Sequence, residues 1–288
     1  MKLSMIMTSR NRCEEIKRYV NSLNSQKGNV FSSLQLIFID QGDNQAAFTN
    51  LNENISFVYI THKPCSLSEA RNIGLQYVTG DYICFPDDDC WYDDDTLEQV
   101  LLFFDGNPKH DGLVICAKNE ENIKINNFPN KERYLTYTDH CGCLSISLFL
   151  KYDSLIRFDE NIGVGSKYNL SSGEETDYLL TYMECHPHFI IYYKPDIVIR
   201  HPLGKYEGFD SEIDKAYRYA RGSGYILRKH KYCWLYKTTS LIRPCLGVLK
   251  RHIYGKNKLK LSKVYCKGKI EGFFFINNYY HIYGKYPN

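Results

Sequence analysis

Three aspartates in a row, Asp87 to Asp89, follow almost directly on the apolar run Tyr82 to Phe85, although acidic triplets are also common in solvated loops. Like charges at close range disfavour joint ionisation, so carboxylates at the end of a buried strand are costly unless a cation joins them. Oxygen ligands in this number suit Mg²⁺ or Mn²⁺ better than zinc, and such ions reach a protein through one or two carboxylates plus substrate phosphates. The triplet therefore predicts a divalent metal site with a nucleotide as its companion.

The residues before the triplet alternate between strand-like and helix-like patterns. Apolar runs at residues 3–7, 34–39 and 55–60 predict three strands. Helical spacing between the first two strands predicts a helix with this apolar face: Ile16, Tyr19, Val20 and Leu23. A second helix is predicted at residues 68–75, ending near Gly80 before a fourth strand, with these residues facing inward: Ala70, Ile73, Leu75 and Tyr77.

This order of elements is a nucleotide-binding layout of the α/β class. Ligands of open α/β sheets lie outside the carboxyl ends of the strands, where Thr8, Asp40 and the aspartates all fall. Residues 1–204 resemble a family 2 glycosyltransferase of the bacterial surface-polysaccharide type, with the GT-A fold. The motifs that carry this resemblance occur in the family's order and spacing: residues 5–12, 38–43, 70–74, 80–83 and the DXD motif at 87–89. The resemblance implies a Rossmann-like mixed sheet flanked by helices.

The resemblance also implies how a nucleotide sugar is bound. Thr8 and Asp40 are expected to line the pocket for the base and ribose, and Arg71 to approach the phosphates. At the position of Gln41 many relatives have a second aspartate, and that aspartate accepts a hydrogen bond from uracil. A glutamine carbonyl can accept the same bond. The expected donor-binding residues are Thr8, Arg10, Asp40, Gln41, Arg71, Asp87 and Asp88, with Asp87 or Asp88 on the ribose.

The expected metal ligands are Asp89, Asp87 and His201, and the expected ion is Mn²⁺ or Mg²⁺. His201 follows the apolar run at residues 197–200. In metal-dependent GT-A enzymes a histidine on a late strand often completes the shell of the ion, and neutral imidazole is a competent ligand. A purely structural role is the alternative for a lone histidine. Zinc is not expected, because the sequence has no two Cys-x-x-Cys pairs.

An inverting enzyme of this family needs a base, because a sugar hydroxyl is a poor nucleophile until its proton is removed. Residues 172–180 resemble the family's Glu-Asp motif at the start of a helix, with Glu175 in the position of the base. Glu174 and Asp177 remain competing candidates. Acidic residues in a first helical turn are also favoured simply by the helix dipole.

The charge of the chain is divided between two parts. The formal net charge is +3, but the part after His201 holds 18 Lys and Arg against five Asp and Glu, so the rest is acidic. The tail also has helical spacing, first at residues 213–220 and again at 241–249, with basic residues between apolar ones. Such helices suit an anionic lipid surface, and a helical cap with a solvated basic face is the alternative. We expect a catalytic domain at residues 1–204 and a basic helical extension at 205–288.

The predicted function is transfer of a sugar from a nucleotide-diphosphate sugar, a UDP-sugar, to a hydroxyl of a glycan acceptor. The resemblance implies O-antigen or capsule synthesis on an undecaprenyl-diphosphate-linked acceptor, at the inner face of the cytoplasmic membrane. The cysteine pattern fits a reduced cytoplasm, no apolar run is long enough to span a bilayer, and no nucleic-acid-reading module is recognised. Two alternatives are a metal-dependent nucleotidyltransferase, although the first turn lacks a glycine-rich loop, and a non-catalytic membrane-surface adaptor.

Overall fold

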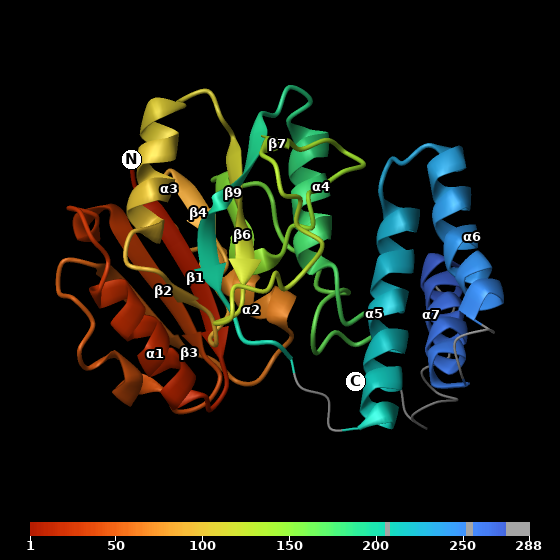
Figure 1. Cartoon of the computed structure of the whole chain (residues 1–288). Coiled ribbons are helices and arrows are strands. Elements are labelled where there is room, and N and C mark those ends of the chain that lie inside the picture. The colour runs from red at the N-terminus through yellow and green to blue at the C-terminus, as the bar shows by residue number, and fades with distance from the viewer. Residues whose placement is uncertain (205–207, 252–255, 275–288) are drawn as a thin grey trace. The chain divides into compact units, whose positions relative to one another are not determined.

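The computed structural model describes residues 1–204, 208–251 and 256–274 (Figure 1). The chain forms two compact units. The first consists of Met1–Cys65, Ala70–Arg157 and Tyr182–Leu203. The second consists of Ser66–Glu69, Phe158–Thr181 and the segment from Gly204 onward.

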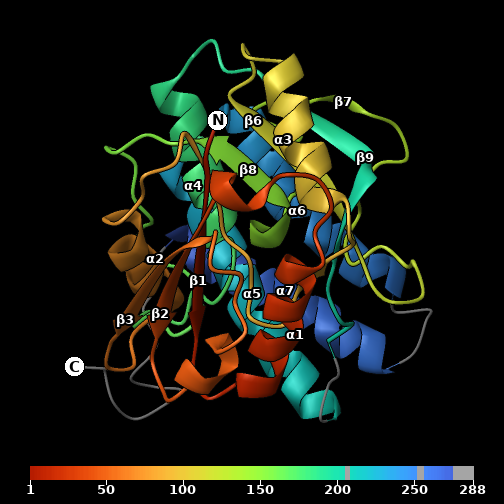
Figure 2. The ribbon, with the colours of Figure 1, turned by 90° about the vertical axis from the view of Figure 1, so that its left-hand side faces the viewer.

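The first unit contains a nine-stranded mixed sheet in the order β3-β2-β1-β4-β8-β6-β9-β5, with β7 paired to β9. Its first four strands are parallel, and Figure 2 shows β1, β2 and β3 side by side. Strand β8 runs antiparallel to both of its neighbours. The strands are β1 (Leu3–Ser9), β2 (Leu34–Asp40), β3 (Ser56–Thr61), β4 (Tyr82–Cys84), β5 (Trp91–Tyr92), β6 (Gly112–Lys118), β7 (Arg133–Tyr134), β8 (Leu148–Lys151) and β9 (Ile191–Arg200).

Helices cover both faces of the parallel strands. Helix α1 (Cys13–Asn24) packs on the face that holds Met5, because the Tyr19 hydroxyl lies 3.5 Å from the Met5 sulfur. Helix α2 (Leu67–Leu75) packs on the opposite face, where a Cβ on Gly74 would come within 2.4 Å of the neighbouring Ile6 side chain. With both faces covered, β1 and β2 are buried almost throughout, as their continuous apolar sequences predict.

Helix α3 (Thr96–Gly106) packs against β4, where Phe104 stacks on Tyr82 with ring centroids 3.9 Å apart. Helix α4 (Glu174–Cys185) begins in the second unit and ends in the first. Three short 3₁₀ turns complete the connections, at Phe31–Ser33, Gln45–Phe48 and Ser145–Ser147.

The second unit is mainly helical, with α5 (Phe209–Lys229), α6 (Trp234–Arg251) and α7 (Lys256–Phe274). Its interior holds an ion pair between Arg221 and Glu271, 3.3 Å apart, and the Tyr217 hydroxyl donates to the same carboxylate. Helices α6 and α7 are also joined by a disulfide between Cys245 and Cys266. The sequence did not predict this bond, because the two cysteines are 21 residues apart and show no recognisable spacing.

The predicted elements agree with these bounds, with two corrections. The four apolar residues of the first helix are buried, and so are Ala70 and Leu75 of the second. Tyr77 was predicted to face inward but is 44% exposed, because α2 ends at Leu75. Helix α6 begins at Trp234, earlier than the apolar spacing at 241–249 indicates. No helix in the described part of the chain is long and apolar enough to cross a membrane.

Candidate functional site

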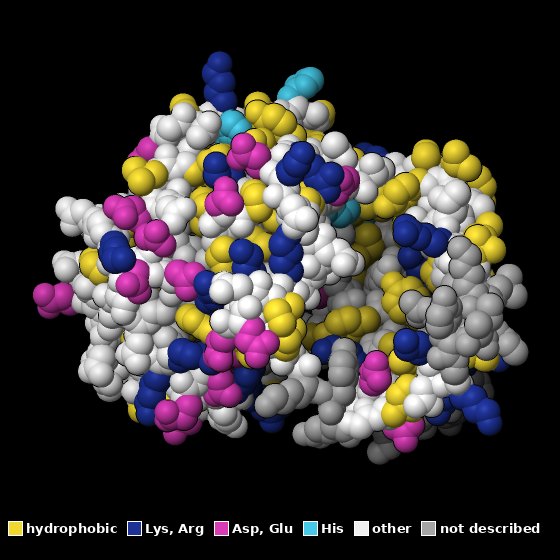
Figure 3. Space-filling view, in the orientation of Figure 1, with side chains coloured by type: hydrophobic (Ala, Val, Ile, Leu, Met, Phe, Trp, Pro, Cys, Tyr) yellow, Lys and Arg dark blue, Asp and Glu magenta, His cyan; other side chains and the backbone are white. Residues whose placement is uncertain are grey.

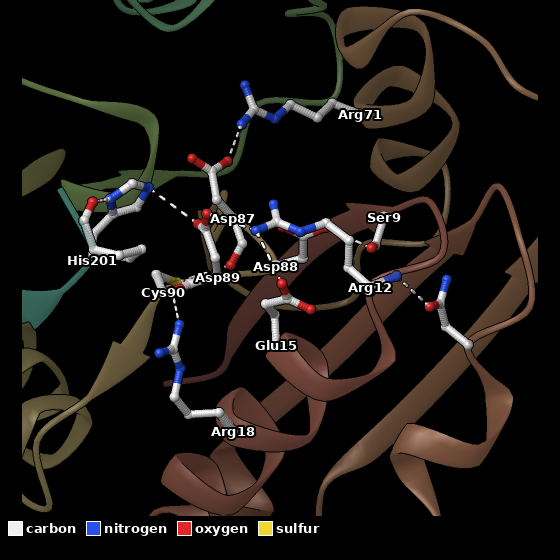
Figure 4. Close-up of polar contacts among 12 residues, drawn as sticks. Ser9, Arg12, Glu15, Arg18, Arg71, Asp87, Asp88, Asp89, Cys90 and His201 are labelled. Carbon is white, nitrogen blue, oxygen red and sulfur yellow. Dashed lines mark hydrogen bonds and ion pairs between the residues drawn. The ribbon is translucent and has the colours of Figure 1, made fainter. Parts of the chain in front are cut away.

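The acidic triplet lies just beyond the carboxyl end of β4, beside the ends of β1 and β2 (Figure 4). The carboxyl ends of parallel strands meet at one edge of a sheet, so side chains from distant parts of the sequence converge there. Ser9 ends β1, Asp40 ends β2, and Asp87 to Asp89 follow β4. The predicted grouping of these residues at one edge is therefore present.

Asp88 is held by two residues of the turn after β1. The Ser9 hydroxyl donates to Asp88 Oδ2 at 2.5 Å, and Arg12 Nη1 donates to Asp88 Oδ1 at 2.6 Å. Burial raises the pKa of the Asp88 carboxyl to about 6, although Ser9 and Arg12 both oppose that shift. Burial thus disfavours the charged form of Asp88, and a nearby cation favours it.

Asp89 is held between Arg12 and His201. Arg12 Nη2 lies 3.0 Å from Asp89 Oδ2, and His201 Nε2 lies 3.1 Å from Asp89 Oδ1. Burial opposes ionisation, but the hydrogen bond and charge of His201, with those of Arg12, lower the pKa of Asp89 to about 2. Burial also opposes the charged imidazole, yet Asp89 raises the pKa of His201 above its usual value. His201 Nδ1 lies 2.6 Å from the Pro202 carbonyl oxygen, which turns Nε2 toward Asp89.

Asp87 faces the buried guanidinium of Arg71, which comes from α2. Arg71 Nη2 lies 3.1 Å from Asp87 Oδ1, and the Arg71 side chain is only 2% exposed. Burial raises the pKa of Asp87, and the charges of Arg71 and His201 partly offset that rise. Arg71 reaches this edge from α2 and presents N–H donors that an anionic ligand can share with Asp87.

The donor chemistry of this cluster fits a hard divalent cation, since it offers carboxylate oxygens and one imidazole nitrogen. The side chains are nevertheless arranged around Arg12, whose guanidinium bridges Asp88 and Asp89. In the part of the chain that the structure describes, no three His, Cys, Asp or Glu side chains converge as metal ligands. A bound ion therefore requires that Arg12 give up at least one of its carboxylates.

The base and ribose side of the predicted site is formed by the ends of β1 and β2. Asp40 is 1% exposed and accepts hydrogen bonds from Tyr59, Gly42 and Asn44. Burial opposes its ionisation, but these bonds, led by that from Tyr59, lower the pKa of Asp40. Asp40 is thus a carboxylate fixed in one orientation.

Gln41 links the ends of two strands by both of its amide atoms. Its Nε2 donates to the Thr8 hydroxyl at 2.8 Å, and its Oε1 accepts from the backbone N–H of Cys65 at 2.7 Å. The carbonyl that was expected to meet a uracil ring is therefore engaged with the backbone. Arg10, by contrast, is exposed at the tip of the turn after β1.

The candidate bases begin helix α4 in the second unit. Glu174 is buried, Glu175 is half-buried, and Asp177 is fully buried. Asp177 accepts from His230 Nε2 at 2.8 Å and from Lys229 Nζ at 2.9 Å. Its carboxylate is thus bound at the end of α5.

Sequence reasoning missed four residues that organise these groups. Ser9 and Arg12 hold the acidic triplet, and Lys229 and His230 hold Asp177. Arg12 lies in the motif at residues 5–12, so its place beside the candidate donor site was the available signal. The pairing of α4 with the end of α5 had no such signal, because about 50 residues separate them and no motif includes Lys229 or His230.

Comparisons with known proteins find matches both to the sequence and to the fold of this chain. The family model described as "Glycosyl transferase family 2" matches residues 4–163. The minor teichoic acid biosynthesis protein GgaB of Bacillus subtilis is 33% identical over 130 residues, which is 40% of this chain and 14% of that protein. An uncharacterized glycosyltransferase of Haemophilus influenzae is 31% identical over 114 residues, 37% of this chain and 46% of that one. The matches thus span less than half the length of these relatives.

Solved structures share the fold at low sequence identity. TarS of S. aureus has a TM-score of 0.60 at 15% identity, covering 94% of this chain and 55% of TarS. A shorter TarS fragment solved in complex with UDP-GlcNAc is 14% identical with a TM-score of 0.60, covering 94% of this chain and 91% of the fragment. The mannosyltransferase PcManGT of Pyrobaculum calidifontis, solved with GDP-Man and Mn²⁺, has a TM-score of 0.63 at 12% identity, covering 96% and 88%.

Proposed function

Since the chain belongs to glycosyl transferase family 2 and has the GT-A fold, we propose that it transfers a sugar, with inversion, from a UDP-sugar to a glycan hydroxyl. The observation that carries this proposal is the cluster at the edge of the parallel strands. There, each of three carboxylates lies within hydrogen-bonding distance of Arg12, the buried Arg71 or His201. Relatives of the same fold were solved with UDP-GlcNAc and with GDP-Man and Mn²⁺, which supports a nucleotide sugar as the donor.

We assign the donor-binding roles by position in this cluster. Asp40 is fixed by four donors that fill its acceptor positions, so we assign it to shaping the pocket for the ribose and base. Gln41 supports this pocket by holding Thr8 rather than by meeting uracil with its carbonyl. Arg71 is suited to bind a phosphate oxygen, since its guanidinium is buried and directed at Asp87.

Asp89, with Asp87 and His201, is proposed to hold Mn²⁺ or Mg²⁺. The hydrogen bond of His201 Nδ1 to a carbonyl supports this role, because it leaves Nε2 directed at Asp89 and available as a ligand when the imidazole is neutral. When bound, the ion supplies positive charge that stabilises the leaving diphosphate. If an ion took its place beside Asp88 and Asp89, Arg12 would be released to pair with a phosphate oxygen.

Glu175 is the proposed base, and Glu174 is the remaining alternative. Asp177 is disfavoured, because its carboxylate is fully buried and bound by Lys229 and His230. A base must be accessible to the acceptor hydroxyl, and Glu175 at the first turn of α4 is only half-buried. We infer that Asp177 instead anchors the helix that carries the base.

The proposed acceptor is a lipid-linked glycan or cell-wall polymer. The relative GgaB is named for minor teichoic acid biosynthesis. Cell-wall polymers are therefore candidate acceptors besides the O-antigen and capsule glycans that the sequence suggests. Contact with an anionic membrane is supported by the basic composition of the C-terminal part and by hydrophobic side chains gathered on the surface over α6 (Figure 3).

The test is release of nucleoside diphosphate by the purified chain. With Mn²⁺ and a panel of UDP-sugars and GDP-mannose, we expect turnover with at least one donor and its loss in EDTA. Asp89→Asn and Glu175→Gln should each lower kcat by about 100-fold or more, as removal of a charge-stabilising group or a general base does. Glu174→Gln separates the two candidate bases.

The matched control is Asp94→Asn, which removes an exposed carboxylate near the triplet in sequence but paired only loosely with Lys27, 3.7 Å away. We expect it to keep full activity. Absence of nucleoside diphosphate release with every donor would overturn the proposal. Pyrophosphate release from a nucleoside triphosphate would replace it with nucleotidyl transfer.

A further inference from the structure

The helical second unit contains a cavity of ≈ 620 Å³ between α5, α6 and α7. This volume lies within the range of about 300–1,000 Å³ that is usual for small-molecule sites. Residues from all three helices line it: Ala216, Tyr236, Ser240, Arg243, Pro244, Leu261, Ser262, Tyr265 and Lys269. The disulfide between Cys245 and Cys266 joins the two helices that form most of its wall.

The cavity brings two cations together. Arg243 lies at its exposed rim, and Lys269 is partly buried in its wall. Burial lowers the pKa of Lys269, and the nearby charge of Arg243 lowers it further. Among the described residues that line the cavity none is acidic. The nearby Glu271 is already engaged by Arg221 and Tyr217.

Two like charges beside a partly desolvated space repel each other, and an anion placed between them removes that cost. The rest of the lining suits an oxyanion, because hydroxyl groups of Ser240, Tyr236 and Tyr265 can donate hydrogen bonds beside the two cations. Phosphate oxygens accept several such bonds at once, and arginine and lysine are their usual partners. The cavity is also larger than a bare phosphate needs, so it can admit the organic group that carries the phosphate.

We propose that this cavity is a binding site for a phosphate ester, either a small organic phosphate or the headgroup of an anionic lipid, held by Arg243 and Lys269. Both sources share the same phosphate chemistry. The site lies within the helical unit and uses none of the residues assigned to the donor or to the metal, so it does not depend on the proposed transfer activity.

The experiment uses the full chain carrying Asp89→Asn, in EDTA, so that the donor site cannot contribute. One arm titrates glycerol phosphate by calorimetry. The other measures co-sedimentation with vesicles of phosphatidylcholine with or without phosphatidylglycerol. The test variant is Arg243→Gln with Lys269→Gln, and the matched control is Lys256→Gln with Lys263→Gln, which removes the same charge from exposed positions of α7 outside the cavity.

We expect the test variant to bind at least about tenfold more weakly than the control in one arm or both, because hydrogen bonds to charged groups are lost. A difference for glycerol phosphate indicates a small phosphate ester, and a difference only for phosphatidylglycerol vesicles indicates a lipid headgroup. The exchange Arg243→Lys with Lys269→Arg should keep binding. Equal binding by test variant and control in both arms, or none by the parent chain, would overturn the proposal.

Discussion

At the scale of single residues, Asp159 shows how one carboxylate can hold two segments of the helical unit together. Lys229 Nζ lies 2.8 Å from Asp159 Oδ2, the Tyr225 hydroxyl donates to the same oxygen at 2.7 Å, and the backbone N–H of Asn161 donates at 3.0 Å. Burial opposes ionisation, but these partners, led by Lys229, lower the pKa of Asp159 to about 2. Lys229 also binds Asp177, so the same lysine anchors the helix of the candidate base.

A carboxyl whose folded pKa is depressed stabilises the fold above its unfolded pKa of about 4, and this stability is lost as the pH falls toward 2. The shift to about 2 corresponds to about 2 kcal/mol. We therefore expect Asp159→Asn to lower the free energy of unfolding by about that amount at pH 7, and the difference to shrink below pH 4. Urea unfolding across this pH range measures it. The exposed Asp196→Asn is the control, and a pH-independent difference for Asp159→Asn would contradict the assignment.

The acidic triplet marks the limit of prediction at this scale. That Asp87 to Asp89 would meet Thr8 and Asp40 at one sheet edge followed from strand order, because each residue ends or follows an apolar run. The pKa values of these carboxyls differ: burial raises that of Asp88 to about 6, whereas His201 and Arg12 overcome burial and lower that of Asp89 to about 2. These differences depend on burial and on the direction of donor side chains, which only the fold creates. Side-chain direction over three ångströms has no signature in the sequence.

At the scale of elements, helices α5 and α7 pack through glycines. A Cβ on Gly224 would lie 2.0 Å from the Lys269 carbonyl oxygen, and one on Gly272 would lie 2.0 Å from that of Arg221. Gly268 faces Tyr217 in the same way. The absence of side chains lets the two backbones approach closely, which brings Arg221 to Glu271.

We expect Gly224→Ala to lower the free energy of unfolding by about 1–3 kcal/mol, since the added methyl group meets backbone that cannot move aside. Alanine in place of glycine by itself stabilises a helix by about 1 kcal/mol. A net loss of stability can therefore be attributed to the close contact between α5 and α7. The control is Gly106→Ala at the end of α3, where a Cβ would meet nothing within 4 Å. Urea unfolding followed by circular dichroism compares them. Equal stability of the two variants would show that α5 and α7 are not held by this contact.

The helices themselves could be predicted in part. Spacing at residues 213–220 indicated α5, which has Tyr217 and Ala220 buried. The start of α6 at Trp234 could not be found in this way, because Trp234 and Leu235 are each 73% exposed and follow no buried stripe. Apolar periodicity detects the residues that a fold buries, whereas these apolar residues face outward.

At the scale of the whole molecule, outward-facing apolar residues coincide with the basic part of the chain. Leu235, Ile242 and Leu246 are 73%, 49% and 53% exposed and recur at helical spacing along α6. The part after His201 has an excess of 13 positive charges, whereas the rest of the chain is acidic. Exposed apolar residues on a basic helix are suited to the headgroup region of an anionic membrane, where both the apolar area and the charge contribute.

We expect the chain to bind vesicles that contain phosphatidylglycerol. The triple variant Leu235→Ser, Ile242→Ser and Leu246→Ser should bind at least about tenfold more weakly. Each leucine or isoleucine that enters the lipid contributes on the order of 1 kcal/mol or more to binding. The control replaces the exposed Leu102 and Leu155 by serine, outside the helical unit. Co-sedimentation at low and high salt separates the two contributions, since salt screens the charges and leaves the apolar contact. Arg243 and Lys269 are unchanged in both variants, so the phosphate site is not altered. Vesicle binding that is the same in the triple variant and the control would mean that the apolar side chains of α6 do not enter the membrane, and that charge alone draws the basic part of the chain to it.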